Sequence, residues 1–321
     1  MQTIDKKIKE SSQTIEILSN IISKEFYGQK KIVEQVLTCI LSSGNALLIG
    51  VPGLGKTLLF QTISDCMNLK SNRIQCTPDL MPSDILGTEI LSKKDNQSFT
   101  FIKGPIFCQL LMIDEINRAS PRTQSAFLQA MQEGNISVGG KNINLPKPFI
   151  VLATQNPIEQ EGTYNLPEAQ LDRFLMQIDI EYPDQDTEKL ILENSTNNNK
   201  NTSSFSNNDL NKTIELIEKI TVGESVLNYV LRLIRNLRPE TSNFDFIKKY
   251  VRWGPGPRGG LALIQSSKAR SVLRKNYSPT ISDIVNLAKP TLRHRISLNF
   301  EARSEQIKID QLIEKVCSEL D

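Results

Sequence analysis

The stretch GVPGLGKT, residues 50–57, decides the fold that we expect for this chain of 321 residues. It has the spacing GxxxxGK[ST], and it follows NALLIG (45–50), a short apolar run that is typical of a buried strand. Glycines let such a loop curl until its N–H groups point inward, and the N-terminus of a following helix adds positive potential. The stretch therefore predicts a phosphate-binding loop, in which Lys56 reaches the β- and γ-phosphates and the Thr57 hydroxyl binds Mg²⁺.

Apolar runs of the same kind recur in the first half of the chain, and helical segments separate several of them. Helices are expected at about 1–25, 30–42 and 121–133, the last with Ser120 as its N-cap and Gly134 just beyond its end. This alternation predicts an α/β fold, a parallel sheet sandwiched by helices, through about residue 183. The further apolar runs are LLMID (110–114), FIVLAT (149–154) and FLMQIDI (174–180).

The pattern changes after residue 183. Residues 194–209 are rich in asparagine and serine, which is typical of a solvated, flexible loop. We therefore expect two domains, an α/β nucleotide-binding core with an N-terminal helix over 1–183 and a smaller all-α domain over 184–321. The helical patterns of the second domain lie at about 210–219, 224–237, 259–274 and 281–289.

Composition argues against several classes of function. The formal net charge is +2, so no basic field suggests non-specific nucleic-acid binding, and no apolar run reaches the roughly 18 residues of a membrane span. The start of the chain lacks the apolar core of a signal peptide, and the five cysteines form no CxxC pair. We therefore expect a cytoplasmic protein with reduced thiols. The single histidine, His294 in LRHRI, lacks the partners of a metal site, and we expect no catalytic role for it.

Polar residues follow two of the apolar runs, at the strand ends where parallel sheets bind their ligands. Asp114 and Glu115 close LLMIDE, and a carboxylate at the end of a buried strand is costly unless it meets a cation. Asp114 therefore fits a Mg²⁺ ligand beside Thr57, and Glu115 fits the group that orients or activates a water for attack on the γ-phosphate. Asn156 in VLATQNP either hydrogen-bonds the γ-phosphate or the attacking water, or opens a turn as Asn-Pro pairs commonly do.

The stretch WGPGPRGG, residues 253–260, surrounds Arg258 with glycines and prolines. Prolines fix the backbone and stop the preceding structure, and glycines let the chain bend tightly. The next helix begins there, so its positive end and the Arg258 guanidinium together favour an anion site. The alternative is a structural turn whose arginine is solvated.

Taken together, these motifs resemble those of the AAA+ ATPases and, more narrowly, those of the MoxR family. The resemblance covers nearly the whole chain, from YGQ (27–29) to LRHRI. It implies an AAA+ core followed by a helical lid, ATP and Mg²⁺ as cofactors, and a homo-oligomeric ring, which we expect to be a hexamer. The stretches that carry it are TPDLMPSDILG (77–87), FIKGPIF (101–107), LLMIDEINRASPRTQSAFLQAMQEG (110–134), PFIVLATQNPIEQEGTYNLPEAQLDRF (148–174) and GPGPRGG (254–260).

The resemblance also assigns roles within the site. Asn156 matches the sensor-1 position, and Arg173 in LDRF matches the arginine finger, which reaches the ATP of the neighbouring subunit. A guanidinium supplied in trans stabilises the charge that spreads over the γ-phosphate during its cleavage. Arg118 and Arg122 are the competing candidates for this role.

Arg258 matches sensor 2, which contacts the γ-phosphate of the same subunit's ATP, and YGQ matches the segment that lines the adenine pocket through backbone contacts. Together with the loop residues, this completes the set expected to bind the nucleotide: Gly50, Val51, Pro52, Gly53, Leu54, Gly55, Lys56, Thr57, Leu58, Asp114 and Arg258.

Two inserts mark the subgroup. Residues 83–104 resemble the helix-2 insert, expected to be a hairpin that turns at SKKDNQ (92–97), and residues 135–146 resemble the pre-sensor-1 hairpin. In related rings such hairpins line the pore or face a substrate. The alternative is that they are exposed hairpins that only pack on the ring.

The function that these features favour is ATP hydrolysis in a ring that acts as a chaperone, remodelling, assembling or maturing a client protein. The resemblance implies a separate partner with a von Willebrand factor A domain. One alternative is an AAA+ machine acting on DNA, which the near-neutral charge disfavours. The other is a slow, nucleotide-gated binding switch, although the presence of both Glu115 and Arg173 favours turnover.

Overall fold

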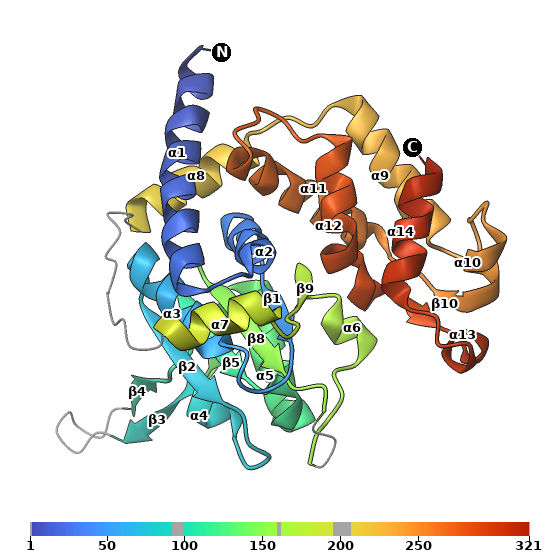
Figure 1. The fold of residues 1–321 in the computed structure, drawn as a ribbon. Coiled ribbons are helices and arrows are strands. Elements are labelled where there is room, and N and C mark those ends of the chain that lie inside the picture. The colour runs from blue at the N-terminus through green and yellow to red at the C-terminus, as the bar shows by residue number, and fades with distance from the viewer. Residues whose placement is uncertain (1, 92–98, 159–161, 195–206, 321) are drawn as a thin grey trace.

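The computed structural model of the chain describes residues 2–91, 99–158, 162–194 and 207–320. Its centre is a five-stranded parallel sheet in the order β2–β5–β8–β1–β9 (Figure 1). The four predicted apolar runs are strands of this sheet. The sequence did not predict β2 (SNRIQ), because it is an edge strand in which only Ile74 is buried. The strands are β1 (Ala46–Ile49), β2 (Ser71–Gln75), β5 (Leu110–Asp114), β8 (Ile150–Gln155) and β9 (Met176–Asp179).

The central strands are buried on both faces of the sheet. In β5, Leu110 and Met112 join the hydrophobic cluster on one face, while Leu111 and Ile113 join the cluster on the other. This double burial explains why the strands read as continuous apolar runs. One face packs on α1 (Gln2–Glu25), α2 (Lys30–Leu41) and α3 (Lys56–Met67), and the other on α4 (Pro82–Leu86) and α5 (Pro121–Glu133).

The ends of α5 confirm the predicted caps. The Ser120 hydroxyl accepts a hydrogen bond from the Thr123 N–H at 3.3 Å, and Gly134 ends the helix with a φ of 63°. That left-handed conformation favours glycine, so the turn that follows begins at a fixed residue.

Two antiparallel hairpins stand where the inserts are predicted. β3 (Gly87–Leu91) pairs with β4 (Phe99–Lys103), and β6 (Asn135–Val138) pairs with β7 (Lys141–Asn144). The turn predicted at 92–97 lies outside the described residues. The hairpins touch, because a Cβ added at Gly139 would lie 2.5 Å from Oε1 of Glu89.

The second half of the chain is mainly helical, as predicted; α7 lies over the core, and α11 and α12 lie within the lid (Figure 1). It also contains a short antiparallel ribbon of β10 (Val251–Trp253) and β11 (Ser297–Leu298), too short to leave a pattern in the sequence. Of the predicted loop over 194–209, residues 195–206 lie outside the described residues. The helices are α7 (Gln185–Asn194), α8 (Asn207–Glu218), α9 (Glu224–Asn236), α10 (Asp245–Tyr250), α11 (Pro257–Leu273), α12 (Ile281–Leu292), α13 (Phe300–Ser304) and α14 (Ile309–Leu320), with a 3₁₀ turn, η2 (Arg293–Arg295).

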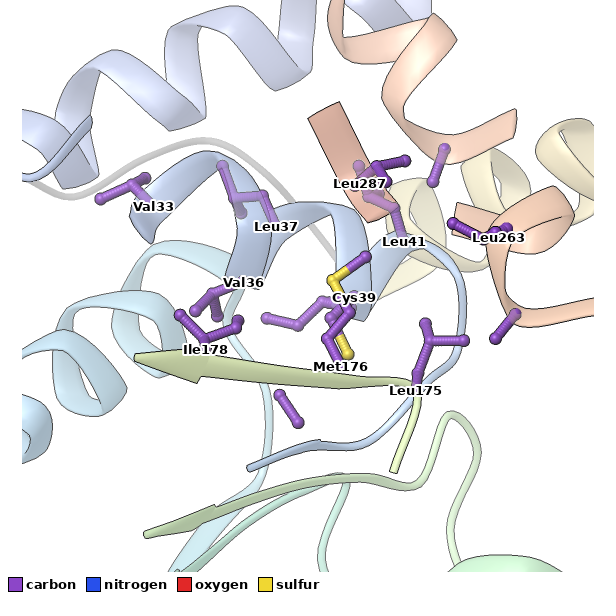
Figure 2. Packing of buried hydrophobic residues seen from close by; sticks show 14 of the residues in the cluster. Val33, Val36, Leu37, Cys39, Leu41, Leu175, Met176, Ile178, Leu263 and Leu287 are labelled. Carbon is purple, nitrogen blue, oxygen red and sulfur yellow. The ribbon is translucent and has the colours of Figure 1, made fainter. Parts of the chain in front are cut away.

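Helix α2 joins the two halves. Figure 2 shows it between β9 and the lid, with Val36 toward Ile178 of β9 and Leu41 toward Leu287 of α12. All four side chains belong to one hydrophobic cluster that runs from the sheet into the lid. The division into domains at residue 183 therefore stays a prediction, since the apolar core is continuous across it.

All five cysteines belong to the described residues, where they are buried and form no disulfide bond. Burial raises the pKa of Cys66 to about 11 and that of Cys76 to about 12, so neither thiol forms a reactive thiolate near neutral pH. Within the described ranges, no helix combines the length and the apolar character that crossing a membrane requires.

Candidate nucleotide-binding and hydrolysis site

The phosphate-binding loop joins β1 to α3, as the sequence predicts. Gly53 and Gly55 have φ values of 84° and 74°, so the loop uses backbone conformations that favour glycine. The ammonium group of Lys56, the first residue of α3, donates hydrogen bonds to the carbonyl oxygens of Gly50 and, at 3.3 Å, Val51. The lysine thus lies over its own loop, where a phosphate would meet it.

Lys56 and the two acids form one electrostatic cluster at the C-terminal edge of the sheet, where the parallel strands end. Burial lowers the pKa of Lys56, and the nearby negative charges of Asp114 and Glu115 oppose that shift. The Asp114 carboxylate and the Thr57 hydroxyl are oxygen ligands of the kind that Mg²⁺ prefers. The residues present therefore fit a Mg²⁺-bound nucleotide at this edge.

The Asp114 carboxylate accepts hydrogen bonds on both oxygens. The Thr154 hydroxyl of β8 donates to Oδ1 at 2.5 Å, and Nη2 of Arg73 donates to Oδ2 at 2.5 Å. Arg73 comes from β2 and supplies the positive charge that a largely buried carboxylate needs. Sequence reasoning missed Arg73, because it did not predict β2.

Glu115 adopts the left-handed conformation, with φ 54° and ψ 54°, which is uncommon for a residue other than glycine. Its N–H donates to the Thr154 hydroxyl oxygen at 2.9 Å. Its carboxylate accepts from Nε2 of Gln75 at 3.1 Å and from Nη1 of Arg118 at 3.2 Å, the latter in the 3₁₀ turn η1 (Ile116–Arg118). Both the main chain and the side chain of Glu115 are therefore held in a defined orientation.

Asn156 lies just past the end of β8, next to the phosphate-binding loop. It is buried, and its Oδ1 accepts a hydrogen bond from the N–H of Ile158 at 3.1 Å. The N–H of Gly50 donates to the carbonyl oxygen of Gln155 at 3.3 Å, so the end of β8 directly adjoins the start of the loop. Asn156 therefore opens a turn and also lies beside the loop that would hold the phosphates, so the structure allows both predicted roles.

A second group of charged residues lies at the N-terminal edge of the sheet, where the strands begin. β9 starts at Met176, which is level with Ala46, the first residue of β1, and Arg173 comes three residues earlier. Nη1 of Arg258, in the first turn of α11, lies 3.6 Å from Oδ2 of Asp172. The phosphate-binding loop leaves the opposite end of β1, and a strand of this length spans about 13 Å.

A hollow of about 270 Å³ opens between the core and the lid at this N-terminal edge. Among the described residues that line it, Arg173, Arg258 and Arg295 are basic and Asp172 is the only acid. The hollow therefore carries a net positive charge and suits an anionic group.

A larger cavity of about 490 Å³ lies beside the phosphate-binding loop and is lined by Gly28 of YGQ, by Tyr182 and by Arg293 of the lid. The ring of Phe26, two residues before Gly28, lies against the loop, because a Cβ added at Gly55 would lie 3.1 Å from it.

Three lid residues line this cavity, namely Lys289, Arg293 and Asp310. The Arg293 guanidinium pairs there with the carboxylates of Asp179 and, at 2.7 Å, Asp310. Sequence reasoning did not single out Arg293, although it lies in LRHRI.

Comparison with known proteins identifies the family of this chain. The model of the ATPase family associated with various cellular activities (AAA) matches residues 45–176, and the AAA lid domain model matches 246–316. The chain is 36% identical over 297 residues to the chaperone MoxR1 of Mycobacterium tuberculosis, covering 92% of this chain and 78% of that protein. The chain belongs to the MoxR family of AAA+ ATPases.

Two further relatives of this MoxR-family chain cover most of its length. Protein YeaC of Bacillus subtilis is 36% identical over 306 residues, covering 92% of this chain and 91% of that one. A crystal structure from Cytophaga hutchinsonii superposes with a TM-score of 0.90 at 37% identity, covering 98% of this chain and 96% of the other. This structural match spans both the core and the lid, so the two structures share the arrangement of the lid relative to the core.

One predicted site residue of this MoxR-family chain lies away from the phosphate-binding loop. The sequence predicts that Arg258 contacts the γ-phosphate of the same subunit, yet Arg258 pairs with Asp172 at the edge of the sheet away from the phosphate-binding loop. The helix begins where expected, but the lid docks so that this end of α11 meets the segment carrying Arg173. Arg118, in contrast, lies beside Glu115 of its own chain, which disfavours it as a residue that acts in trans.

Thr154 is a residue that sequence reasoning left without a role. Its hydroxyl bridges the Asp114 carboxylate and the Glu115 N–H, so the Thr154→Val substitution removes one partner from each. We expect turnover of ATP to fall about 5- to 100-fold, and the free energy of unfolding to fall by about 1–3 kcal/mol. Steady-state ATP hydrolysis and urea unfolding measure the two effects.

The matched control is Thr38→Val, which removes a buried hydroxyl that donates to a helix carbonyl in α2, away from the site. It should cost stability without a comparable loss of turnover. Full turnover in Thr154→Val would show that the bridge has no part in catalysis.

Proposed function

We propose that this MoxR-family chain hydrolyses ATP with Mg²⁺ between neighbouring subunits of a homo-oligomeric ring, a hexamer. The observation that carries the proposal is the separation of two charged groups by the length of a strand, one group at each end of β1. Lys56 and Glu115 lie at one edge, and Arg173 and Arg258 lie at the other. Phosphoryl transfer uses groups of both kinds around one phosphate, and a ring brings the second edge of one subunit to the first edge of the next.

Each residue at the C-terminal edge has a definite task in this proposal. Lys56 binds the β- and γ-phosphates, and Thr57 and Asp114 hold Mg²⁺, which when bound neutralises negative charge on the phosphate oxygens. Glu115 accepts the proton of the attacking water, and Asn156 orients that water or the γ-phosphate. The hydrogen bonds of Glu115 to Gln75 and Arg118 support this role, because they hold the carboxylate in one orientation.

The adenosine part of ATP fits the cavity of about 490 Å³ beside the loop. Gly28 has a φ of 72° and a Cβ there would meet Thr187, so the YGQ turn needs glycine at this position, and Gly28 is exposed at the cavity. Backbone contacts of this kind would recognise the adenine edge, and the exposed Tyr182 adds an aromatic face.

The output that we propose is the remodelling or maturation of partner proteins in the cytoplasm, as a chaperone. The relative in Mycobacterium tuberculosis is named a chaperone, which supports this choice over an action on DNA. The hairpin β3–β4 supports it too, because it exposes apolar side chains suited to a protein surface rather than to phosphates. A separate protein with a von Willebrand factor A domain is the partner that we propose. The exposed residues are Ile90, Leu91, Phe99 and Ile102.

The test of interface catalysis is the rate of ATP hydrolysis per chain at increasing protein concentration. If two subunits build each site, the rate per chain should rise as rings assemble and then level off, with assembly followed by ultracentrifugation. The Lys56→Ala variant should bind ATP about 10- to 100-fold more weakly, because a charge-assisted contact to phosphate is lost. Lys70→Ala, at an exposed lysine just past α3, is the control. A rate per chain that stays constant down to the monomer would contradict the proposal.

A further inference from the structure

The segment of the lid that contains His294 and Arg295 forms hydrogen bonds to the main chain on both sides of Arg173. Nη2 of Arg295 donates to the carbonyl oxygens of Phe174 at 2.7 Å and Asp172 at 3.1 Å. Its Nε donates to the Asp172 carboxylate at 2.7 Å. Arg295 is almost fully buried, so its charge is balanced by these contacts rather than by water.

His294 adds a second contact to the same carbonyl group. Its Nε2 lies 3.1 Å from the oxygen of Phe174, which can only accept, so Nε2 carries the proton. Burial, with the adjacent charge of Arg295, lowers the pKa of His294 well below its usual value and keeps the ring neutral. The only histidine of the chain therefore acts as a fixed donor to the segment that carries Arg173.

The same arginine also touches the helix that carries Arg258. Gly259 in the first turn of α11 leaves room for Arg295, because a Cβ there would lie 3.3 Å from its Cδ. Asp172 completes the link, since its two carboxylate oxygens face Arg295 and Arg258. The buried guanidinium of Arg295 therefore contacts the residues on both sides of Arg173, and it is linked through Asp172 to Arg258.

We propose that Asp172, His294 and Arg295 are positioning residues that hold Arg173 and Arg258 as a single unit facing the phosphates of the neighbouring subunit. The proposal rests on the function in trans proposed above. Arginine side chains are long and flexible, so their aim depends on the main chain that carries them, and a misplacement of about 1 Å can cost roughly 100-fold in rate. Because these contacts come from the lid, a movement of the lid moves both arginines together.

Other contacts also hold the lid against the core. Arg270 of α11 pairs with Glu34 of α2 at 3.1 Å, and the Ser12 hydroxyl donates to the carbonyl oxygen of Val272 at 2.8 Å. Both contacts lie away from the segment before β9, and the shared apolar cluster joins the same elements. The contacts to 172–175 therefore add a constraint on that segment in particular.

The experiment compares kcat, KM and ATP affinity in assembled protein carrying Asp172→Asn, His294→Leu or His294→Gln. Asp172→Asn keeps an oxygen for Arg295 but removes the charge shared with Arg258, and His294→Leu removes the donor to Phe174. We expect kcat to fall about 10- to 100-fold in both, with ATP affinity of the isolated subunit within about twofold of the wild type. His294→Gln, whose amide nitrogen can replace Nε2, should recover most of the loss.

The control is Arg274→Gln, which removes an exposed ion pair between the lid and Glu34 and should leave kcat unchanged. Mixing Asp172→Asn with Glu115→Gln subunits should restore activity, because the two defects lie on opposite sides of an interface. Mixing it with Arg173→Ala should restore none. Recovery with Glu115→Gln separates a positioning defect from a misfolded chain.

Normal kcat in Asp172→Asn and His294→Leu, alongside a large loss in Arg173→Ala, would overturn the positioning role and leave the function in trans intact. Equal losses in His294→Leu and His294→Gln would also overturn it, because the donor would then be irrelevant. Normal turnover in Arg173→Ala would instead remove the proposed function on which this inference rests.

Discussion

The Glu115→Gln variant should bind ATP with nearly normal affinity and hydrolyse it about 10²- to 10⁴-fold more slowly. The amide is isosteric with the carboxylate and keeps an oxygen for the hydrogen bonds from Gln75 and Arg118. The N–H bond to Thr154 belongs to the main chain and is unaffected. What is lost is the ability to take a proton from water, so the defect should appear in kcat and not in binding.

Single-turnover hydrolysis and ATP titration separate these two quantities. Glu133→Gln, an exposed glutamate at the end of α5, is the control for a change of charge on this surface. Normal turnover in Glu115→Gln would show that another group activates the water. Slow turnover with weak ATP binding would show that Glu115 contributes to the nucleotide site in the ground state.

The same variant gives access to the client of this MoxR-family chain. A ring that holds ATP without cleaving it should retain a bound partner that the wild type releases. A protein captured by Glu115→Gln in ATP, but by neither the wild type nor Lys56→Ala, would identify a client together with its dependence on the nucleotide. Capture independent of ATP would indicate a constitutive partner instead of a remodelled one.

The core of the fold could be predicted because its strands are buried on both faces. β1, β5, β8 and β9 are continuous apolar runs, and each has a polar or glycine residue where it meets the site. β2 escaped prediction because only Ile74 is buried in it, and with β2 the partners of the acidic pair, Arg73 and Gln75, were missed as well. A residue that acts from an edge strand leaves little trace in hydrophobic periodicity.

Arg258 illustrates a different limit. The sequence predicts correctly that a helix begins at GPGPRGG and brings an arginine to its positive end. It does not contain, in any local pattern, the direction in which the lid docks on the core. That direction follows from the packing of α11 and α12 on α2, which turns Arg258 toward Asp172 and Arg293 toward the cavity of about 490 Å³.

Mixing two inactive variants, Arg173→Ala and Glu115→Gln, should produce active rings. Loss of a finger arginine lowers kcat by about 10³- to 10⁵-fold, so each variant alone should have almost no ATPase activity. In a random equimolar ring, roughly one interface in four joins an intact Glu115 to an intact Arg173 from the next subunit, since ring interfaces are head-to-tail. Turnover should therefore return to about that fraction of the wild type.

The pairing of defects makes the assay specific for the edge on which each residue acts. Lys56→Ala with Glu115→Gln should give no recovery, because both residues serve the same edge of one chain. Arg258→Ala should behave like Arg173→Ala and recover with Glu115→Gln, because both arginines lie beside Asp172.

Failure of the Arg173→Ala mixture, in rings confirmed to contain both variants, would argue against an arginine supplied in trans from this segment. Applying the same assay to Arg122→Ala would then test the remaining exposed arginine at the start of α5. Arg118 should give no recovery in any mixture with Glu115→Gln, because its guanidinium contacts Glu115 of its own chain at 3.2 Å and both changes would fall on the same edge. The set of mixtures thus assigns each arginine to its own subunit's nucleotide or to its neighbour's.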